Sequence, residues 1–142
     1  MSIIRFLQLN FIPRSSNLAL LVLRLWLGLT MLLLHGLVKL QGYAEMSTKF
    51  PDPFGIGSKA SLSLAIFAEV VCSILLILGL FTRFAALNLV VTMTVAFAVA
   101  HKAALTGPGN GELAFIYLAG YAVLLIAGAG RFSLDASLGS KR

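Results

Sequence analysis

The chain has 142 residues, of which 59% are hydrophobic and only 11% are charged. A soluble domain carries about 25% charged residues, so this composition predicts a single domain embedded in a membrane. The net charge is +6, but the basic residues are scattered and lie mostly at the ends of apolar runs, which is typical of membrane orientation and argues against a nucleic-acid partner. The single cysteine, Cys72, cannot form an internal disulfide or a CxxC redox pair.

Residues 1–17 precede the first long apolar run. They place Arg5 and Arg14 among apolar side chains, with Pro13 as a helix breaker. We expect either a short helix lying in the membrane interface or a disordered tail. A cleaved signal peptide is less well supported, because the next apolar run is too long for a signal sequence and lacks a small-x-small cleavage site.

The first predicted membrane helix covers residues 18 to about 40. At about 100° per residue, its polar and small residues fall within about 80° of one another. These residues are Arg24, Gly28, Met31, His35 and Lys39. The pattern predicts a helix face that points into a bundle rather than toward lipid.

The second predicted membrane helix covers about residues 61–81 and places Glu69 inside an otherwise apolar run. A helix of about 20 residues crosses about 30 Å of hydrocarbon. A charge near the centre costs about 2.5–3.5 kcal/mol on insertion scales, so Glu69 must face the bundle, find a partner or become neutral. The preceding connection, residues 41–60, contains FPDPFGIGSKA and is expected to be a loop.

Two further membrane helices are predicted, over about residues 84–102 and 112–129. Only Thr82 and Arg83 separate the second and third helices, so these two should be antiparallel neighbours. The sequence LTGPGNG breaks the chain between the third and fourth helices, and a polar, basic tail covers residues 130–142.

The resulting fold class is all-α, an integral membrane bundle of four transmembrane helices spanning residues 18–129. The positive charges favour cytoplasmic N- and C-termini, because one side of this topology is richer in Lys and Arg than the other. The richer side holds Arg5, Arg14, Arg83, Arg131, Lys141 and Arg142, and the other holds Lys49, Lys59 and Lys102.

Ionisable side chains from all four predicted helices converge toward the outer half of this bundle. They are Arg24, His35, Lys39, Glu69, His101 and Glu112. Glu69 lies roughly 12 Å deep at about 1.5 Å per residue, and the long side chain of Arg24 could extend toward it from below. A structural interpretation stays open: Arg24–Glu69 could be an ion pair that fixes helix register, and the groups at helix ends could be ordinary interfacial residues.

Three kinds of ligand suit such a set. A quinone head group could accept hydrogen bonds from His and Arg, with Glu69 or Glu112 carrying protons. Two histidines and two carboxylates could instead hold zinc, copper or iron. His35 and His101 could also ligate a haem.

Five segments of the chain resemble the DoxX family of small four-helix membrane proteins. They are LRLWLGLTMLLLHGLVKL (23–40), FAEVVCSILLILGLFTRFAAL (67–87), the alanine-rich third helix ending in His101, NGELAFIYLAG (110–120) and GAGRFSLD (128–135). The resemblance implies a four-helix bundle in the bacterial inner membrane. Residues that match by position are Arg24, His35, Gly36, Lys39, Glu69, Gly79, Arg83, His101, Glu112, Gly130, Arg131 and Asp135.

The family name is tied to a thiosulfate:quinone oxidoreductase of sulfur-oxidising archaea. Other members resemble membrane anchors of complexes with a sulfurtransferase and superoxide dismutase, accompany copper-binding peptide systems, or look like assembly and export helpers. Because the family is functionally mixed, membership supports the fold better than any one reaction.

We therefore expect a lipid-embedded membrane subunit of a quinone-linked oxidoreductase or redox-stress complex, with a separate redox partner protein as electron donor. Glu69, His101 and Glu112 are the expected catalytic residues, and Arg24, His35 and Lys39 the expected quinone-binding residues. The alternatives are a non-catalytic scaffold or chaperone and a metal-binding membrane protein. A homo-oligomer formed through the third or fourth helix is also left open.

Overall fold

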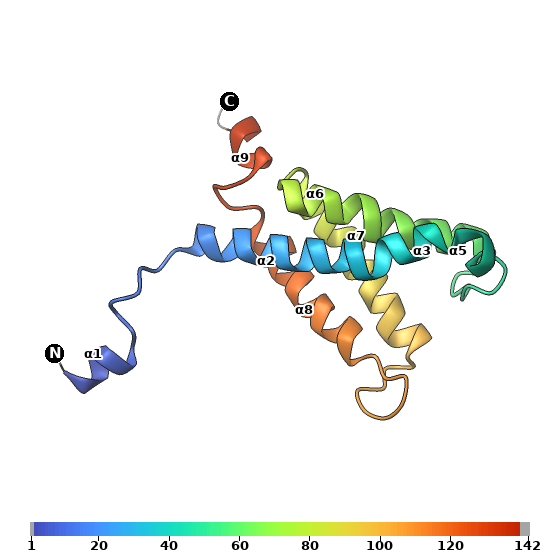
Figure 1. Ribbon diagram of the computed structural model, residues 1–142, viewed down its shortest axis with the longest axis horizontal. Helices are drawn as coiled ribbons and strands as arrows, with labels where there is room; N and C mark the ends of the chain where they lie inside the picture. Colours follow the sequence, from blue (N-terminus) through green and yellow to red (C-terminus); the bar gives the residue numbers. More distant parts are fainter. Residues whose placement is uncertain (1, 140–142) are drawn as a thin grey trace.

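The computed structural model describes residues 2–139 and is helical in all its regular secondary structure over that range (Figure 1). Residues 140–142, the end of the predicted basic tail, lie outside the described residues. Four long helices dominate. The first consists of α2 (Ser16–Met31), the π-helical segment η1 (Leu32–Gly36) and α3 (Leu37–Gln41), and the second of α5 (Ser58–Ile66), the π-helical segment η2 (Phe67–Cys72) and α6 (Ser73–Leu78). The third consists of α7 (Thr82–Val95) and the π-helical segment η3 (Ala96–Ala100), and the fourth is α8 (Glu112–Ala127). Short helices are α1 (Ile3–Leu7), α4 (Tyr43–Met46) and α9 (Leu134–Gly139).

Three of the long helices are long and apolar enough to cross a membrane: Ser16–Gln41 with 26 residues, Ser58–Leu78 with 21 and Thr82–Ala100 with 19. The apolar helix α8 has 16 residues, which corresponds to about 24 Å at 1.5 Å per residue. The predicted fold class, an all-α membrane protein, is confirmed. The cytoplasmic placement of the termini stays a prediction.

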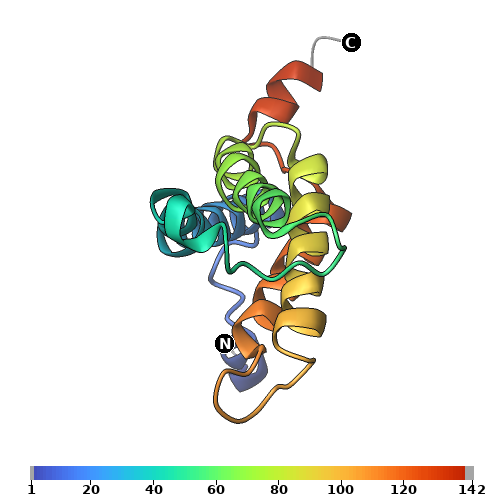
Figure 2. The same cartoon turned by 90° about the vertical axis from the view of Figure 1, so that its right-hand side faces the viewer.

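Successive long helices run antiparallel, so the bundle has two different ends. We call the end near the start of α2 and the end of α8 the terminal end, and the opposite end the loop end. At the terminal end, the backbone N–H of Arg131 donates to Asn17 Oδ1 over 2.9 Å, which joins the segment after α8 to the start of α2. At the loop end lie the connections 42–57 and 101–111. Figure 1 shows α6 running alongside α2, and Figure 2 shows α7 and α8 side by side, with α1 standing apart from the bundle.

The turn between α6 and α7 is held by the C-terminal segment. Gly79 and Phe81 both have positive φ, 68° and 48° respectively. The carboxylate of Asp135 accepts hydrogen bonds from the backbone N–H groups of Phe81 and Thr82 over 2.7 and 2.9 Å, so it caps the first turn of α7. A β-carbon at Gly79 would collide with the guanidinium of Arg24, so this position needs glycine for space as well as for its backbone conformation.

The interior of the bundle is narrow and apolar. Its fully buried side chains include Met31, Leu76, Leu89, Tyr121 and Leu124. Large apolar side chains also cover the outside of the long helices, and Trp26, for example, is 70% exposed. An apolar exterior around a small core is what a lipid-embedded bundle requires, because lipid replaces water as the solvent of the outer face.

Candidate functional site

Lys39 and Glu69 form an ion pair inside the bundle. Lys39 Nζ lies 2.6 Å from Glu69 Oε2, and the two side chains are 19% and 6% exposed. Lys39 comes from α3 and Glu69 from η2, so the pair links the first and second long helices. This contact supplies the partner that a carboxylate within a membrane helix needs.

The backbones of these two helices approach closely at Gly36. A β-carbon at Gly36 would lie 2.6 Å from the carbonyl oxygen of Glu69, so only glycine fits here. Gly36 ends η1, and Glu69 lies within η2. The contact therefore joins two π-helical segments, whose wider turns are rare and often found at functional sites. It also brings Lys39, less than one turn further along, to the carboxylate.

A cavity of about 400 Å³ lies beside the ion pair. Its walls come from α3, α5, η2, α7 and η3, and the connection 50–54 covers one side. The polar lining residues are Lys39, Ser61, Glu69, Asn88, Thr92 and His101, and the aromatic ones are Phe50, Phe54 and Phe67. Most of the remaining lining is aliphatic. The site thus combines an apolar volume with a few convergent polar groups, as small-molecule pockets do.

The cavity reaches the outer surface of the bundle between α5/η2 and α7/η3. The lining side chains Leu64, Val91 and Val99 are 55%, 52% and 49% exposed and lie on these helices. In a membrane-spanning chain such a surface faces lipid. A ligand with an apolar tail could therefore place its polar head near Lys39 and Glu69 while its tail lies among the acyl chains.

Asp52 holds the loop that covers the cavity. Its carboxylate accepts hydrogen bonds from the N–H of Ile56 over 3.0 Å, from the N–H of Gly57 over 2.8 Å and from the hydroxyl of Ser61 over 2.9 Å. These bonds tie the loop to the start of α5. The backbone hydrogen bond from Gly57 is the main reason that the pKa of Asp52 lies below its ordinary value.

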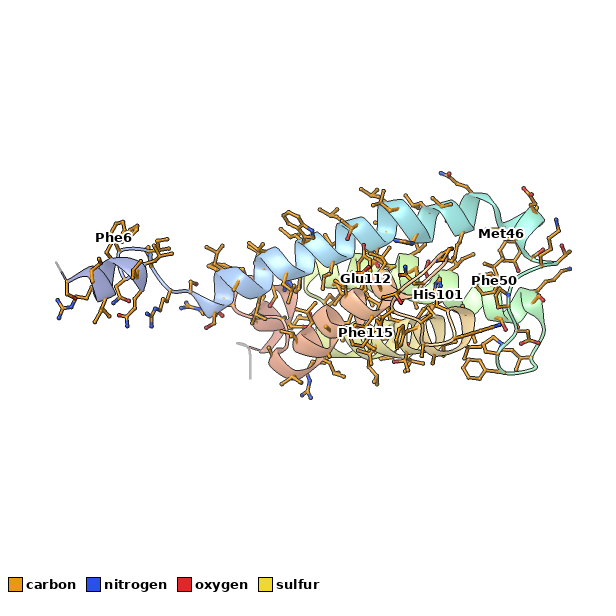
Figure 3. The ribbon with its side chains drawn as sticks, turned by 90° about the horizontal axis from the view of Figure 1, so that it is seen from below. Phe6, Met46, Phe50, His101, Glu112 and Phe115 are labelled. Atoms are coloured by element: carbon orange, nitrogen blue, oxygen red, sulfur yellow. The ribbon has the colours of Figure 1, made fainter. Side chains whose placement is uncertain are left out.

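His101 belongs to the cavity lining at the end of α7/η3. Its Nδ1 lies 2.8 Å from the carbonyl oxygen of Gly109. A carbonyl oxygen only accepts, so this bond places the proton on Nδ1 and leaves Nε2 without one in the neutral ring. Figure 3 shows His101 and Phe50 toward the same end of the bundle, far from Phe6 on α1.

The predicted contact between Arg24 and Glu69 is wrong. Arg24 is 1% exposed, and its guanidinium donates to the carbonyl oxygens of Ala129 over 2.9 Å and of Phe132 over 2.6 Å. It is thus directed toward the terminal end, where it anchors the segment after α8. Its role in this structure is to hold the chain terminus against the bundle, and it does not contribute to the cavity.

His35 and Glu112 also lie outside the cavity lining. The His35 ring packs edge-on against Tyr117, with the ring centroids 5.8 Å apart. Glu112 is the exposed first residue of α8 (Figure 3). The structure therefore brings Lys39, Glu69 and His101 of the six predicted site residues together in the cavity lining and leaves Arg24 and Glu112 out of it. His35 also lies outside the lining, but it is close enough to Lys39 and Glu69 for both charges to act on it.

A metal site receives no support from the geometry. Within residues 2–139, no three His, Cys, Asp or Glu side chains come close enough to share a metal ion. Cys72 is fully buried in the apolar core, below Glu69 on the same long helix.

Sequence reasoning did not assign Asn88 and Thr92 to the site. Both line the cavity from α7, and the Thr92 hydroxyl donates to the carbonyl oxygen of Asn88 over 2.8 Å. The available signal was their spacing, because polar residues four apart in an apolar helix share one face. That face points at the cavity.

Comparison with known proteins identifies the family. The profile of the DoxX family matches residues 19–102, which include η1, η2, the ion pair and all the residues that line the cavity. The chain belongs to the DoxX family.

Two curated relatives come from Haemophilus influenzae, and both are described as uncharacterized proteins. One is 35% identical to this DoxX chain over 127 residues, which cover 85% of the chain and 83% of the relative. The other is 38% identical over 113 residues, which cover 74% of the chain and 80% of the relative. No solved structure matches the chain significantly.

Proposed function

We propose that this DoxX-family protein is a membrane subunit of a quinone-linked oxidoreductase or redox-stress complex, and that the cavity beside Lys39 and Glu69 binds the quinone head group. The observation that carries the proposal is a buried ion pair on the wall of an apolar cavity that opens toward lipid. Quinones are apolar molecules with a polar ring, so they need both features at one site.

The lining residues fit this ligand. A cavity of about 400 Å³ lies within the usual range for small-molecule sites, and its aromatic residues can pack against a ring. Lys39 keeps two N–H groups beyond the one directed at Glu69, so it can donate to a quinone carbonyl. Glu69 and His101 are the candidate proton-exchanging groups. A bound quinone would supply two-electron redox chemistry that the side chains themselves lack.

The electrons would come from a partner protein, soluble or membrane-bound, because one buried cysteine offers no dithiol couple. We place the subunit in the bacterial inner membrane, with both termini in the cytoplasm. A green fluorescent protein fused to the C-terminus tests this orientation. Fluorescence is expected for a cytoplasmic terminus. A fusion that is inserted with the subunit folded but does not fluoresce would contradict this orientation.

Quinone binding can be tested with the full chain in mild detergent. Binding of a short-tailed benzoquinone is measured by equilibrium dialysis for the wild type, for Lys39→Met and for Glu69→Gln. We expect binding that weakens at least about tenfold in Lys39→Met, because the principal donor to the ring is lost. Arg14→Met is the matched control, since Arg14 lies outside the bundle. Unchanged affinity in both cavity variants would contradict the proposal.

A scaffold function is the second candidate, favoured by the close backbone contact between Gly36 and Glu69. In that case the Lys39–Glu69 pair only locks two helices together. The exchanged variant, Lys39→Glu with Glu69→Lys, distinguishes the two. A scaffold predicts that the exchange restores both stability and cellular function, whereas a quinone site predicts restored stability without quinone binding.

A further inference from the structure

Three polar groups that line the cavity have already used their only hydrogen. The Thr92 hydroxyl donates to the carbonyl oxygen of Asn88 over 2.8 Å. The Ser61 hydroxyl donates to Asp52 Oδ1 over 2.9 Å. The Nδ1–H of His101 donates to the carbonyl oxygen of Gly109 over 2.8 Å. Each acceptor is a carbonyl or carboxylate oxygen, so the direction of these hydrogen bonds is set by chemistry.

These three groups can therefore only accept a hydrogen bond from a ligand. Thr92 offers the lone pairs of its hydroxyl oxygen, Ser61 does the same, and neutral His101 offers Nε2. The Glu69 carboxylate adds further acceptor sites beyond the one used by Lys39. The available side-chain donors of the lining are fewer: the remaining N–H groups of Lys39 and one N–H of Asn88, whose other N–H donates to the carbonyl oxygen of Phe84.

The two redox forms of a quinone differ in whether they can donate hydrogen bonds, which is what the acceptors of this lining require. A quinone has two carbonyl oxygens, which only accept. A quinol has two hydroxyl groups, which donate and also accept. A bound quinone can accept from Lys39 but has no hydrogen to give to the free lone pairs of the Thr92 hydroxyl or of His101 Nε2, whereas a quinol can donate to both.

We infer that the cavity binds the quinol form of a lipid-soluble quinone more tightly than the oxidised form, with Thr92 and His101 accepting its hydroxyl hydrogens. Lys39 donates to an oxygen of the same ring. This inference rests on the proposed function and adds which redox form the site prefers. Thr92 is a specificity-determining residue in this scheme, because it contributes an acceptor and no donor.

Binding to the wild-type protein is the first test. The affinities of a decyl-tailed benzoquinone and of its quinol are measured by equilibrium dialysis against the full chain in mild detergent, with the quinol kept reduced under argon. We expect the quinol to bind about tenfold more tightly, as two additional hydrogen bonds of modest net strength would produce.

The variant Thr92→Val then tests the assigned acceptor, because valine keeps the shape of threonine without its oxygen. We expect quinol affinity to fall about fivefold while quinone affinity stays the same. Thr94→Val is the matched control. Thr94 lies on the same helix, and its hydroxyl donates to the carbonyl oxygen of Val90 over 2.7 Å, but it does not line the cavity. Both affinities should be unchanged in this control.

The outcomes separate this inference from the proposal it rests on. Equal affinities, or tighter binding of the quinone, overturn the preference for quinol but leave a quinone site in place. An equal loss for both ligands in Thr92→Val also overturns it, because the hydroxyl would then not distinguish the two forms. Failure of the wild type to bind either ligand overturns the proposed function and the inference together.

Discussion

Lys39 Nζ lies 2.6 Å from Glu69 Oε2, across the contact between the first and second long helices. Glu69 is almost completely buried, whereas Lys39 keeps part of its surface exposed. Removing the lysine would therefore leave a buried charge without a partner. Removing both charges would leave a neutral contact.

Lys39→Met is expected to destabilise the protein more than the double variant Lys39→Met, Glu69→Gln. Loss of one partner from a buried pair costs roughly 3 kcal/mol, and neutralising the second partner should recover most of this cost. Thermal unfolding in detergent measures both effects. A double variant at least as unstable as the single one would show that the charges do not compensate each other.

Gly36→Ala should disturb the site without removing a functional group. Its new methyl group would meet the carbonyl oxygen of Glu69, which is backbone and cannot rotate away. We expect a loss of about 1–3 kcal/mol, with the two helices forced apart. Gly120→Ala is the control, because a methyl group there meets mainly the flexible side chain of Leu27. The interpretation fails if the two variants unfold at the same temperature.

Arg24→Met is expected to loosen the segment after α8. The guanidinium donates two hydrogen bonds to carbonyl oxygens of this segment, and hydrogen bonds from charged groups contribute about 1.5–3 kcal/mol each. Limited trypsin digestion measures the effect as faster cleavage after Arg131, followed by mass spectrometry. Arg14→Met should leave this cleavage unchanged. Equal cleavage rates in the wild type and Arg24→Met would contradict the anchoring role.

The loop over the cavity should respond to acid through Asp52. Its pKa is lowered from an ordinary value of 3.8 by hydrogen bonds from the backbone and Ser61, so the folded loop favours the ionised carboxyl. The resulting stabilisation is present above about pH 4 and is lost as the pH falls through the lower, folded-state pKa. A carboxyl ¹³C NMR titration should give a midpoint below 3.8, with the amide signal of Gly57 following it. A midpoint at or above the ordinary value would show that the folded loop does not favour the ionised carboxyl of Asp52.

The sequence allowed the helical membrane fold to be predicted because its signals are local. Apolar runs of sufficient length are separated by loop-forming segments, and the short connection between the second and third runs makes these two helices neighbours. The predicted position of that connection was wrong by a few residues: the turn covers residues 79–81, and Thr82 and Arg83 begin α7. Glu69 was also recognisable as a residue requiring a partner, because a carboxylate stands out in an apolar run.

The same pattern of apolar and polar residues could not identify Lys39, rather than Arg24, as the partner of Glu69. Arg24 and Lys39 share a helix face when every residue advances about 100°, but η1 lies between them and its wider turn changes that register. The partners of Arg24 are main-chain carbonyl groups 105 and 108 residues away. Every residue carries a carbonyl group, so no side-chain pattern marks these two.

The distance along the chain between Arg24 and its carbonyl partners has a consequence for synthesis. The helix that contains Arg24 leaves the ribosome long before the segment after α8, because Ala129 follows Arg24 by 105 residues. At about 5–20 residues per second, the ribosome needs roughly 5–20 s to supply this partner. Throughout that interval the guanidinium depends on water or lipid head groups drawn toward it, as an isolated membrane arginine does. The helix that contains Arg24 thus waits for the segment after α8 before it reaches its final hydrogen bonding, and in a nascent chain interrupted before residue 129 it never does.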